Sequence, residues 1–348
     1  MAKDRSGSVR PFLAWTARMW SAVALTMLVG GCVLLQSRSG SSSSARTPKD
    51  AVVRQERAEC GRLTEKEVKK RDYLPPCPAT PPGLHGKLKV REDVSLEEAV
   101  QDLADGVGVG GSWAPPDCVP RWSIAIIVPF RDRQPQVGPF LYHMHNFLQR
   151  QQLNYSIYIV EQEGTELFNR ARLLNVGYLE ALREGPFDCY AFHDIDMLPE
   201  DDRHLYHCSE QPRHLAVAAS NHNYKSSHSL VYNKYFGGAC LMTQDHLARV
   251  NGWSNIYWGW GGEDDDMWRR LSFEDLPVWR FPANIARYRT IKHGPQVVNN
   301  KRYQTLKRNT GRYPNDGLST IKYIVKSVVR HPLYTHIAAD IGTPLPPS

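Results

Sequence analysis

The chain has 348 residues, of which 41% are hydrophobic, and it contains 25 glycines and 24 prolines, a length that suits one large globular domain with appendages. The formal net charge is +7, and part of it is concentrated at the start, where Lys3, Arg5, Arg10 and Arg18 face only Asp4, a local balance of +3. No cluster of lysine and arginine interleaved with aromatic residues follows along the sequence. Composition therefore argues against a nucleic-acid partner.

A membrane segment is predicted near the N-terminus. Met19–Leu35 is a 17-residue run without a formal charge, at the short end for a membrane-spanning helix. Because the basic residues precede it, residues 1–18 are expected to form a cytoplasmic tail, residues 19–35 a signal anchor, and the remainder to enter the lumen. A cleaved signal peptide is the alternative, since Gly30, Gly31 and Cys32 are small, but the apolar run is long and starts late.

The next segment, residues 36–75, begins with a polar, serine-rich stretch that cannot form a core, and it is predicted to be a flexible stem. The folded domain is expected over residues 76–348. Near its start, Ser95–Ala104 has a capping-box serine and glutamate followed by apolar residues on one face, which predicts a short surface helix. The segment between this helix and Cys118 is interpreted as a loop.

Ile124–Val128 is a continuous apolar run without alternation, typical of a strand buried on both faces of a mainly parallel sheet. It leads into Pro129–Arg133. Ligands of α/β folds bind at the C-terminal ends of parallel strands, and Arg131 and Arg133 there suit a phosphate-rich or planar ligand. Ordinary surface salt bridges are the alternative for these arginines.

Strands and helices then alternate. A helix is predicted over Phe140–Gln152, a strand over Ser156–Val160, a helix over Leu167–Arg183 with Phe168 on its apolar side, and a strand over Cys189–Phe192. This order predicts a doubly wound α/β domain.

The strand ending at Phe192 leads into Asp194 and Asp196, one residue apart. Two carboxylates at a buried strand end suit a divalent cation that neutralises a diphosphate. An Asx-type turn leaving the sheet is the structural alternative. A phosphohydrolase also uses such a pair, but the Thr/Gly turn that normally follows its nucleophile is absent from the residues after Asp196.

Trp258–Asp266 reads WGWGGEDDD, in which tryptophans and glycines run into four consecutive carboxylates. Glycine lets the backbone approach a ligand, an indole offers a flat apolar face to a sugar ring, and a nearby carboxylate can take a proton from a hydroxyl. The stretch is interpreted as an acceptor platform with a general base. A solvated acidic helix start is the alternative.

Taken together, several motifs carry a resemblance. In chain order, VPFRDRQ, LQRQQLNYSIYIV, FNRARLLNVGYLEAL, FHDIDMLP, QPRHLAVA, YFGGACL, NGWSNIYWGWGGEDDDMWRRL and DGLSTIKY resemble the β-1,4-galactosyltransferase family over Cys77–Thr343. The resemblance implies a GT-A glycosyltransferase fold, a Rossmann-like mixed α/β sheet with an Asp-x-Asp metal site, as one lumenal domain behind a type II Golgi membrane anchor. It further implies transfer of galactose from UDP-galactose, with Mn²⁺, to the 4-hydroxyl of terminal N-acetylglucosamine on glycoproteins or glycolipids, with inversion.

Carried over motif by motif, the resemblance implies a donor site. Its residues are Pro129, Phe130, Arg131, Arg133, Phe168, Asn169, Arg170, Asp194, Ile195, Lys225, Tyr232, Tyr235 and Trp260. The segment before Lys225 is longer than in the family pattern. A bulky aromatic at Tyr235 is expected to disfavour an N-acetyl group on the donor sugar, which points to galactose.

The same resemblance implies the catalytic and acceptor groups. Asp264 is expected to be the base, Glu263 and Asp265 to contact the acceptor, and Trp260 to swing over the donor. Gly294–Thr310 resembles a loop that closes over bound donor. The expected acceptor site comprises Gly261, Gly262, Glu263, Asp264 and Asp265, with Arg302, Tyr303 and Leu306 as the pocket for an N-acetyl group, in a segment about three residues shorter than the family pattern.

For the metal, the resemblance implies Asp196 as a direct ligand, together with His293. The family's second metal motif has methionine where this chain has Thr290. A hydroxyl is a harder and weaker ligand than a thioether, which predicts weaker Mn²⁺ binding, a recruited water or better tolerance of Mg²⁺.

Seven cysteines suit an oxidising lumen. The resemblance pairs Cys77 with Cys118 and Cys189 with Cys208, and leaves Cys240 as a buried thiol. Asn154 begins an N-glycosylation sequon, expected in a turn before a strand.

Two alternatives remain at this point. One is a related transferase for N-acetylgalactosamine, or for galactose to another acceptor such as glucose or xylose. The other is an inactive glycan-binding relative, against which the retained metal and base residues argue. The sequence leaves open a homodimer formed through the membrane helix or stem.

Overall fold

The structure is a computed structural model, which describes residues 74–224 and 234–344. Both ranges belong to one compact unit, Thr64–Ser348. The predicted cytoplasmic tail, signal anchor and stem, up to residue 73, lie outside the described residues. Within these two ranges, no helix is both long and apolar enough to span a membrane.

A mixed eight-stranded sheet is the centre of the domain. Its strands follow the order β10-β11-β3-β2-β4-β8-β6, and β1 pairs with β3. β11, β3, β2 and β4 run parallel, and β1, β6, β8 and β10 pair antiparallel to their neighbours. The strands are β1 (Ser112–Trp113), β2 (Ser123–Phe130), β3 (Asn154–Gln162), β4 (Cys189–His193), β6 (Arg213–His214), β8 (Ala239–Met242), β10 (Ile324–Arg330) and β11 (Thr335–Asp340).

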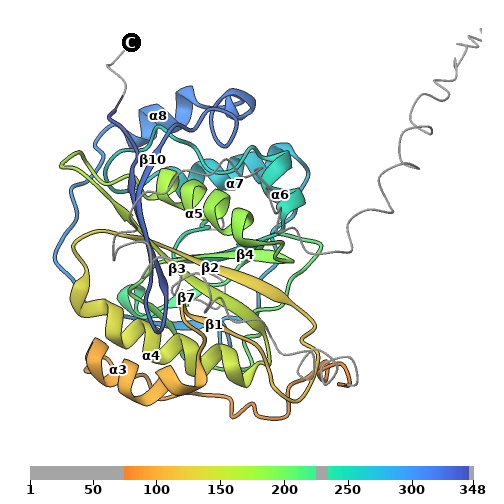
Figure 1. Cartoon of the computed structure of the whole chain (residues 1–348). Helices are drawn as coiled ribbons and strands as arrows, with labels where there is room; N and C mark the ends of the chain where they lie inside the picture. Colours follow the sequence, from red (N-terminus) through yellow and green to blue (C-terminus); the bar gives the residue numbers. More distant parts are fainter. Residues whose placement is uncertain (1–73, 225–233, 345–348) are drawn as a thin grey trace, which may run out of the picture. The chain divides into compact units, whose positions relative to one another are not determined.

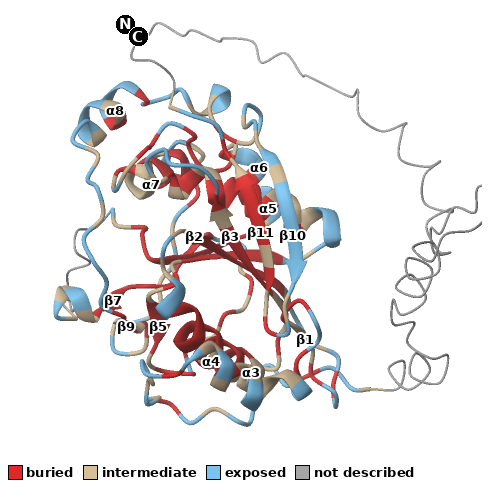
Figure 2. Cartoon of the chain, turned by 60° about the vertical axis from the view of Figure 1, so that its left-hand side comes forward, coloured by how far each residue is buried: buried red, intermediate tan, exposed pale blue. Residues whose placement is uncertain are grey.

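Helices cover both faces of this sheet (Figures 1 and 2). α3 (Leu96–Leu103) and α4 (Gln134–Arg150) lie on one face, and α5 (Arg170–Glu184), α6 (Gln244–Arg249) and α7 (Glu263–Phe273) on the other. The remaining helical segments are η1 (Ala104–Gly106), η2 (Ser220–His222), α8 (Arg302–Arg308) and η3 (Tyr313–Asn315).

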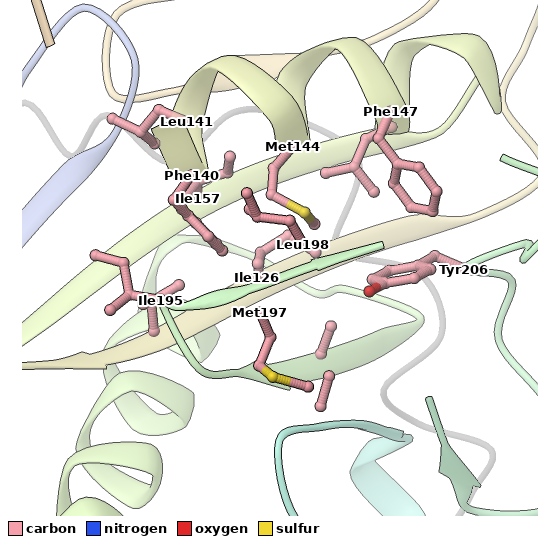
Figure 3. Close-up of a cluster of buried hydrophobic side chains, with 14 of the residues drawn as sticks. Ile126, Phe140, Leu141, Met144, Phe147, Ile157, Ile195, Met197, Leu198 and Tyr206 are labelled. Carbon is pink, nitrogen blue, oxygen red and sulfur yellow. The ribbon is translucent and has the colours of Figure 1, made fainter. Parts of the chain in front are cut away.

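The apolar run of β2 explains this layering. Successive side chains of a strand point to opposite faces. Ile126 accordingly packs in the core beneath α4, whereas Ile127 packs in the core beneath α5. Figure 3 shows Phe140, Met144 and Phe147 of α4 gathered over the strands in the first of these cores.

On the other face, α5 lies close to the sheet at Gly177. A Cβ added there would come within 2.4 Å of Ile127 Cγ2 and 2.8 Å of Val160 Cγ2. Glycine therefore permits the close contact between α5 and the parallel strands that carry the site.

Several predicted boundaries were wrong. α4 begins at Gln134, six residues before the predicted start, because Pro135 falls in the first turn, where a missing N–H costs nothing. α5 begins only at Arg170, since the Asn169 side chain caps it by accepting a hydrogen bond from Arg172 N at 3.0 Å. Phe168 therefore precedes the helix. The predicted loop before Cys118 contains η1 and β1.

A second sheet has three short strands, in the order β5-β9-β7. Its strands are β5 (Met197–Pro199), β7 (Ala218–Ala219) and β9 (Arg287–Thr290). β5 and β9 pair antiparallel, which sets Met197 opposite Thr290. Because Asp196 directly precedes β5 and His293 follows β9, this pairing brings Asp196 and His293 close together.

Both expected disulfides are present. Cys77 is bonded to Cys118, and Cys189 to Cys208. Among the described residues Cys240 is a free, buried thiol, as predicted.

Asn154 does not lie in a turn. It is the first residue of β3, half-buried, and its Nδ2 donates a hydrogen bond to Ser123 Oγ at 3.1 Å. Its amide is therefore engaged within the fold.

Candidate active site

A cavity of about 400 Å³ opens where the parallel strands β2 and β4 end. Such strand ends are the common ligand-binding edge of α/β folds. The cavity collects most of the residues that the sequence singled out. Those lining it are Pro129, Arg131, Arg133, Phe168, Arg170, Asp194, Ile195, Asp196, Tyr235, Trp260, Gly261, Gly262, Glu263, Asp264, Asp265, His293, Arg302 and Tyr303.

Four expected residues do not line it: Phe130, Asn169, Thr290 and Leu306. Phe130 and Leu306 are buried in the interior, and Thr290 lies at the end of β9. Asn169 is fully buried, and its Nδ2 donates to Asn255 O at 3.0 Å. Its place is structural, because it caps α5 and ties that helix to the loop before α7.

Two further donor residues, Lys225 and Tyr232, lie outside the described residues.

The glycines of the WGWGGEDDD stretch turn the chain into α7. Gly262 caps the helix at a φ of 100°, where L side chains are strained, and a Cβ there would lie 2.8 Å from Tyr257 Cε1. The predicted platform is only partly formed, since Trp258 is buried and Trp260 is 56% exposed.

The four carboxylates of this stretch divide between two roles. α7 begins at Glu263, the first of the four, so the stretch is a helix start, as the structural alternative proposed. These carboxylates are not, however, all exposed to solvent. Glu263, Asp264 and Asp265 line the cavity. Asp266 is buried, and its Oδ2 pairs with Arg270 Nε at 2.6 Å.

Asp264 is the most perturbed of the cavity carboxylates. Burial, together with the charges of Glu263 and Asp265, raises the pKa of Asp264 to about 8. Its Oδ2 and the Tyr235 hydroxyl both lie 3.0 Å from where a Gly237 Cβ would stand. A carboxylate with this pKa can accept a proton near neutral pH.

His214 forms a hydrogen bond with the backbone of Gly237. Arg280 Nε donates to His214 Nδ1 at 3.2 Å, so Nε2 carries the proton and donates to Gly237 O at 3.0 Å. The edge of the buried imidazole also meets the Tyr235 ring, with 5.2 Å between centroids. This packing fixes Tyr235 against Asp264.

Arg170 joins the two acidic motifs. Its Nε donates to Asp194 Oδ1 at 2.6 Å, and its Nη1 lies 3.6 Å from Glu263 Oε1. Burial raises the pKa of Asp194 to about 6, although the Arg170 guanidinium lowers it in part. Nη1 is buried without a hydrogen-bond partner in the described part of the chain, and a ligand in the cavity could accept from it.

The other end of the cavity is cationic. The Arg131 guanidinium lies 5.5 Å from the centre of the Phe168 ring and donates to Glu166 O at 2.6 Å. Arg133 Nη2 lies 3.2 Å from His293 Nδ1. Two guanidinium groups, one of which lies over the half-buried Phe168 ring, suit a base and its phosphates.

Asp196 and His293 meet between these ends. His293 Nε2 lies 3.3 Å from Asp196 Oδ2, and both side chains are partly exposed to the cavity. Thr290 Oγ1 instead donates to Met197 Sδ at 3.5 Å. Over residues 74–224 and 234–344, no group of three or more His, Cys, Asp or Glu side chains could hold a metal ion.

Trp260 is tied to the segment that resembles a closing loop. Its backbone N donates to Val297 O at 2.8 Å, and its carbonyl accepts from Asn299 N at 3.0 Å. The Arg302 guanidinium lies 5.6 Å from the Trp260 ring centre. Two backbone hydrogen bonds and one cation–ring contact therefore join Trp260 to this segment.

Sequence reasoning assigned no role to seven lining residues: Gln136, Met197, Asn221, His222, Gly237, Gly238 and Tyr257. Gly259 and Gln296 also line the cavity, and each lies in a segment that the sequence had singled out. Gly237 and Gly238 follow Tyr235 in a quoted motif and could have been found by their chemistry. Asn221 and His222 stand in a polar segment without a distinguishing pattern.

Protein-family models match most of the described domain. Residues 77–209 match the N-terminal region of glycosyl transferase group 7, and residues 213–294 match the N-terminal domain of galactosyltransferase. Beta-1,4-galactosyltransferase 2 of Mus musculus is 42% identical over 277 residues, which are 78% of this chain and 74% of that protein. Beta-1,4-galactosyltransferase 1 of Homo sapiens is 42% identical over 275 residues, 78% of this chain and 68% of that protein.

Among solved structures, the catalytic domain of Drosophila beta1,4galactosyltransferase 7 in complex with xylobiose is similar in fold. It superposes with a TM-score of 0.51 and 31% identity, over 64% of this chain and 94% of that chain.

Proposed function

Because this chain belongs to the β-1,4-galactosyltransferase family and is a hexosyltransferase, we propose that it transfers galactose from UDP-galactose to the 4-hydroxyl of terminal N-acetylglucosamine. The observation that carries this proposal is one cavity with a cationic end and an acidic end, where Asp264 stands among groups suited to a sugar.

The donor is assigned to the cationic end. Arg131 and Phe168 would frame the uridine, and Arg133 would lie near the diphosphate. Arg170, Asp194 and Tyr235 lie toward the acidic end and would hold the galactose hydroxyls. The bulky, half-buried Tyr235 ring lines the cavity and would leave little room for an N-acetyl group, which favours galactose over N-acetylgalactosamine.

In the proposed chemistry Asp264 takes the proton of the acceptor 4-hydroxyl, and the oxygen of that hydroxyl attacks the anomeric carbon of galactose. The bond from that carbon to the UDP oxygen breaks, and UDP leaves from the opposite face with the electron pair. One displacement inverts the configuration, and a single well-placed carboxylate is sufficient. Glu263 and Asp265, with Arg302 and Tyr303, would orient the acceptor.

A divalent metal ion is part of the proposal. Asp196 and His293 would hold it, and a carboxylate with an imidazole fits a Mn²⁺ ion that completes its coordination with phosphate and water. When bound, the ion supplies positive charge that stabilises the leaving diphosphate. Since the Thr290 hydroxyl is turned to Met197, Mg²⁺ is expected to serve better here than in a site with a thioether ligand.

The proposed location is the Golgi membrane, with a single-pass type II topology and a lumenal catalytic domain. This part rests on the uncharged run at 19–35 and the basic residues before it. Protease protection of the C-terminus in sealed vesicles, lost on adding detergent, would test the orientation.

The test of activity is transfer by the full chain, purified in detergent, from UDP-galactose to a terminal N-acetylglucosamine acceptor. Chelator-sensitive formation of a β-1,4 linkage is expected. Parallel reactions with UDP-N-acetylgalactosamine, and with glucose or xylose acceptors, address the alternatives. Donor hydrolysis without transfer would show that the acceptor is wrong, and glycan binding without either activity would favour an inactive relative.

A further inference from the structure

A second hollow, the basic groove, lies where α7 meets α8. Its volume is about 450 Å³, within the range of ligand sites. Trp268, Arg269 and Phe273 of α7 line it, with Lys307 of α8 and Lys234. None of these residues belongs to the cavity described above.

The groove is cationic. None of the residues lining it is acidic. Lys234 and Lys307 are exposed, and neither forms an ion pair with a residue in the described part of the chain. The segment 301–312 that forms α8 and its flanks has no acidic residue and contains the basic residues Lys301, Arg302, Lys307, Arg308 and Arg312.

The nearest carboxylate along α7 is engaged elsewhere. Glu274, which follows the helix, lies 3.5 Å from Arg249 Nε through its Oε2 and accepts a hydrogen bond from the Tyr313 hydroxyl. The positive charge of the groove is therefore not neutralised from that side.

Aromatic surface accompanies this charge. Phe273 is 50% exposed and stacks on Tyr313, with 6.2 Å between ring centroids. Arg269 Nη1 donates to Leu306 O at 2.7 Å and to Thr310 Oγ1 at 3.0 Å, which fixes α7 against α8. The half-exposed Phe273 ring suits a sugar ring, and the lysines that line the groove suit an anionic substituent.

The groove continues the acceptor side of the cavity along both helices. Glu263–Asp265 of α7 and Arg302 of α8 line the cavity, whereas later turns of each helix line the groove. From Asp264 to Phe273 the helix rises roughly 13 Å, at about 1.5 Å per residue. An oligosaccharide of a few units spans such a length.

We propose that the basic groove binds an anionic group, a sulfate ester or a sugar carboxylate, on the inner sugars of an acceptor glycan whose terminal sugar occupies the cavity. This inference rests on the proposed function. The end of α7 at the cavity carries three carboxylates, which would repel an anionic group on the acceptor. The basic groove, farther along the same helix, would stabilise such a group. The two pockets would together select acidic, extended glycans.

The experiment compares matched acceptors with the full chain in detergent. A neutral oligosaccharide ending in N-acetylglucosamine is tested beside the same oligosaccharide with a sulfate ester, and with a uronic acid, on an inner sugar. We expect KM to be several-fold lower for at least one anionic acceptor at similar kcat, and the difference to shrink as salt is raised.

Two substitutions locate the effect. Lys307→Gln and Lys234→Gln should each raise KM for the anionic acceptor about two- to fivefold, as loss of an exposed charge contact predicts, with no change for the neutral one. Arg308→Gln is the control, because Arg308 is an exposed neighbour on α8 that does not line the groove. An equal effect of Arg308→Gln would indicate that the general positive charge of α8, and not the groove, attracts the anionic acceptor, and it would overturn the proposed site.

A direct binding measurement separates this inference from the proposed function. Quenching of tryptophan fluorescence by a sulfated trisaccharide without a terminal N-acetylglucosamine should weaken in Lys307→Gln. If neutral acceptors are not galactosylated, the proposed function fails, and this titration still decides the groove. Equal KM values for neutral and anionic acceptors, no quenching, or a preference only for acidic peptide beside a neutral glycan would each overturn the inference.

Discussion

Burial among like charges gives Asp264 a basicity that an exposed aspartate lacks, and the proposed reaction depends on it. Asp264→Asn keeps the shape of the side chain and removes the base. We expect transfer to fall by about 10²- to 10⁴-fold, with UDP binding retained. Initial rates and calorimetric UDP titration measure the two properties.

Asp265→Asn serves as the comparison, because that residue is assigned an acceptor contact and should raise KM more than it lowers kcat. Normal transfer by Asp264→Asn would remove the base assignment.

The pKa of Asp264 also predicts a pH dependence. The base must be deprotonated in the free enzyme, so kcat/KM should rise with pH and level off above a value near 8. A pH–rate profile of the wild type between pH 5.5 and 9, at saturating metal ion, would show this limb. A flat profile would mean that Asp264 is already ionised in the free enzyme.

Thr290 stands where the resemblance implies a methionine in the family's second metal motif. Thr290→Met would supply a thioether in place of a hydroxyl, and we expect Mn²⁺ affinity to rise on the order of tenfold, about 1.4 kcal/mol. Electron paramagnetic resonance of free Mn²⁺ during titration, with UDP present, measures it without turnover.

Thr290→Val is the matched control, since valine keeps the β-branch and offers no ligand atom. An equal rise in both variants would show that steric changes, and not the thioether, alter the site.

At the scale of elements, the start of α7 decides where three cavity carboxylates lie. Gly262→Ala would place a Cβ 2.8 Å from Tyr257 Cε1 and 3.2 Å from Arg302 Cβ, at a φ of 100°. We expect the helix start to shift, with kcat/KM lowered at least about tenfold and stability lowered by about 1–2 kcal/mol. Kinetics and thermal unfolding would report both.

Gly83→Ala is the control for that substitution, because nothing lies within 4 Å of a Cβ there. If Gly262→Ala retained full activity, the close contact with Tyr257 would not be what positions the carboxylates.

Elements also show where sequence reasoning succeeded and failed. β2, β3 and β4 were predicted within a few residues, since each carries an apolar run that only a doubly covered strand can bury. α4 was predicted six residues short because Pro135 and Pro139 resemble a break. Asn169 was assigned to the donor site because it stands between Phe168 and Arg170 in the same motif. Its side chain instead caps α5 and donates a hydrogen bond to Asn255 O.

At the scale of the whole molecule, buried histidines make stability depend on pH. Burial lowers the pKa of His143 and His145 to about 4 and that of His214 to about 3. In the unfolded chain the same groups take a proton near pH 6.5. Between these values the unfolded state binds more protons, so stability falls as the pH drops from about 6.5 toward 4.

We expect each of these histidines to contribute up to about 1.4 kcal/mol per pH unit in that window. Urea unfolding between pH 7.5 and 5 measures the slope. His145→Gln, which can keep a hydrogen bond to Tyr155 or Leu333 but cannot titrate, should lower the slope by one proton. Stability that stays constant down to pH 5 would contradict this prediction.

The sequence by itself determined the family, the mixed α/β fold and most of the cavity. Apolar runs, strand-end carboxylates and the WGWGGEDDD stretch are local features whose chemistry can be stated before the chain is folded. The cysteine pairing also came from sequence, through the resemblance, and the structure contains it.

Only the tertiary structure decided how these groups face one another. Arg170 bridges Asp194 and Glu263, which are 69 positions apart, and Thr290 turns to Met197 because β5 and β9 pair. The basic groove is invisible in sequence for the same reason, since its lysines and aromatic rings come from separate segments. Charge, burial and pKa depend on distances in space, and the order of residues alone does not specify them.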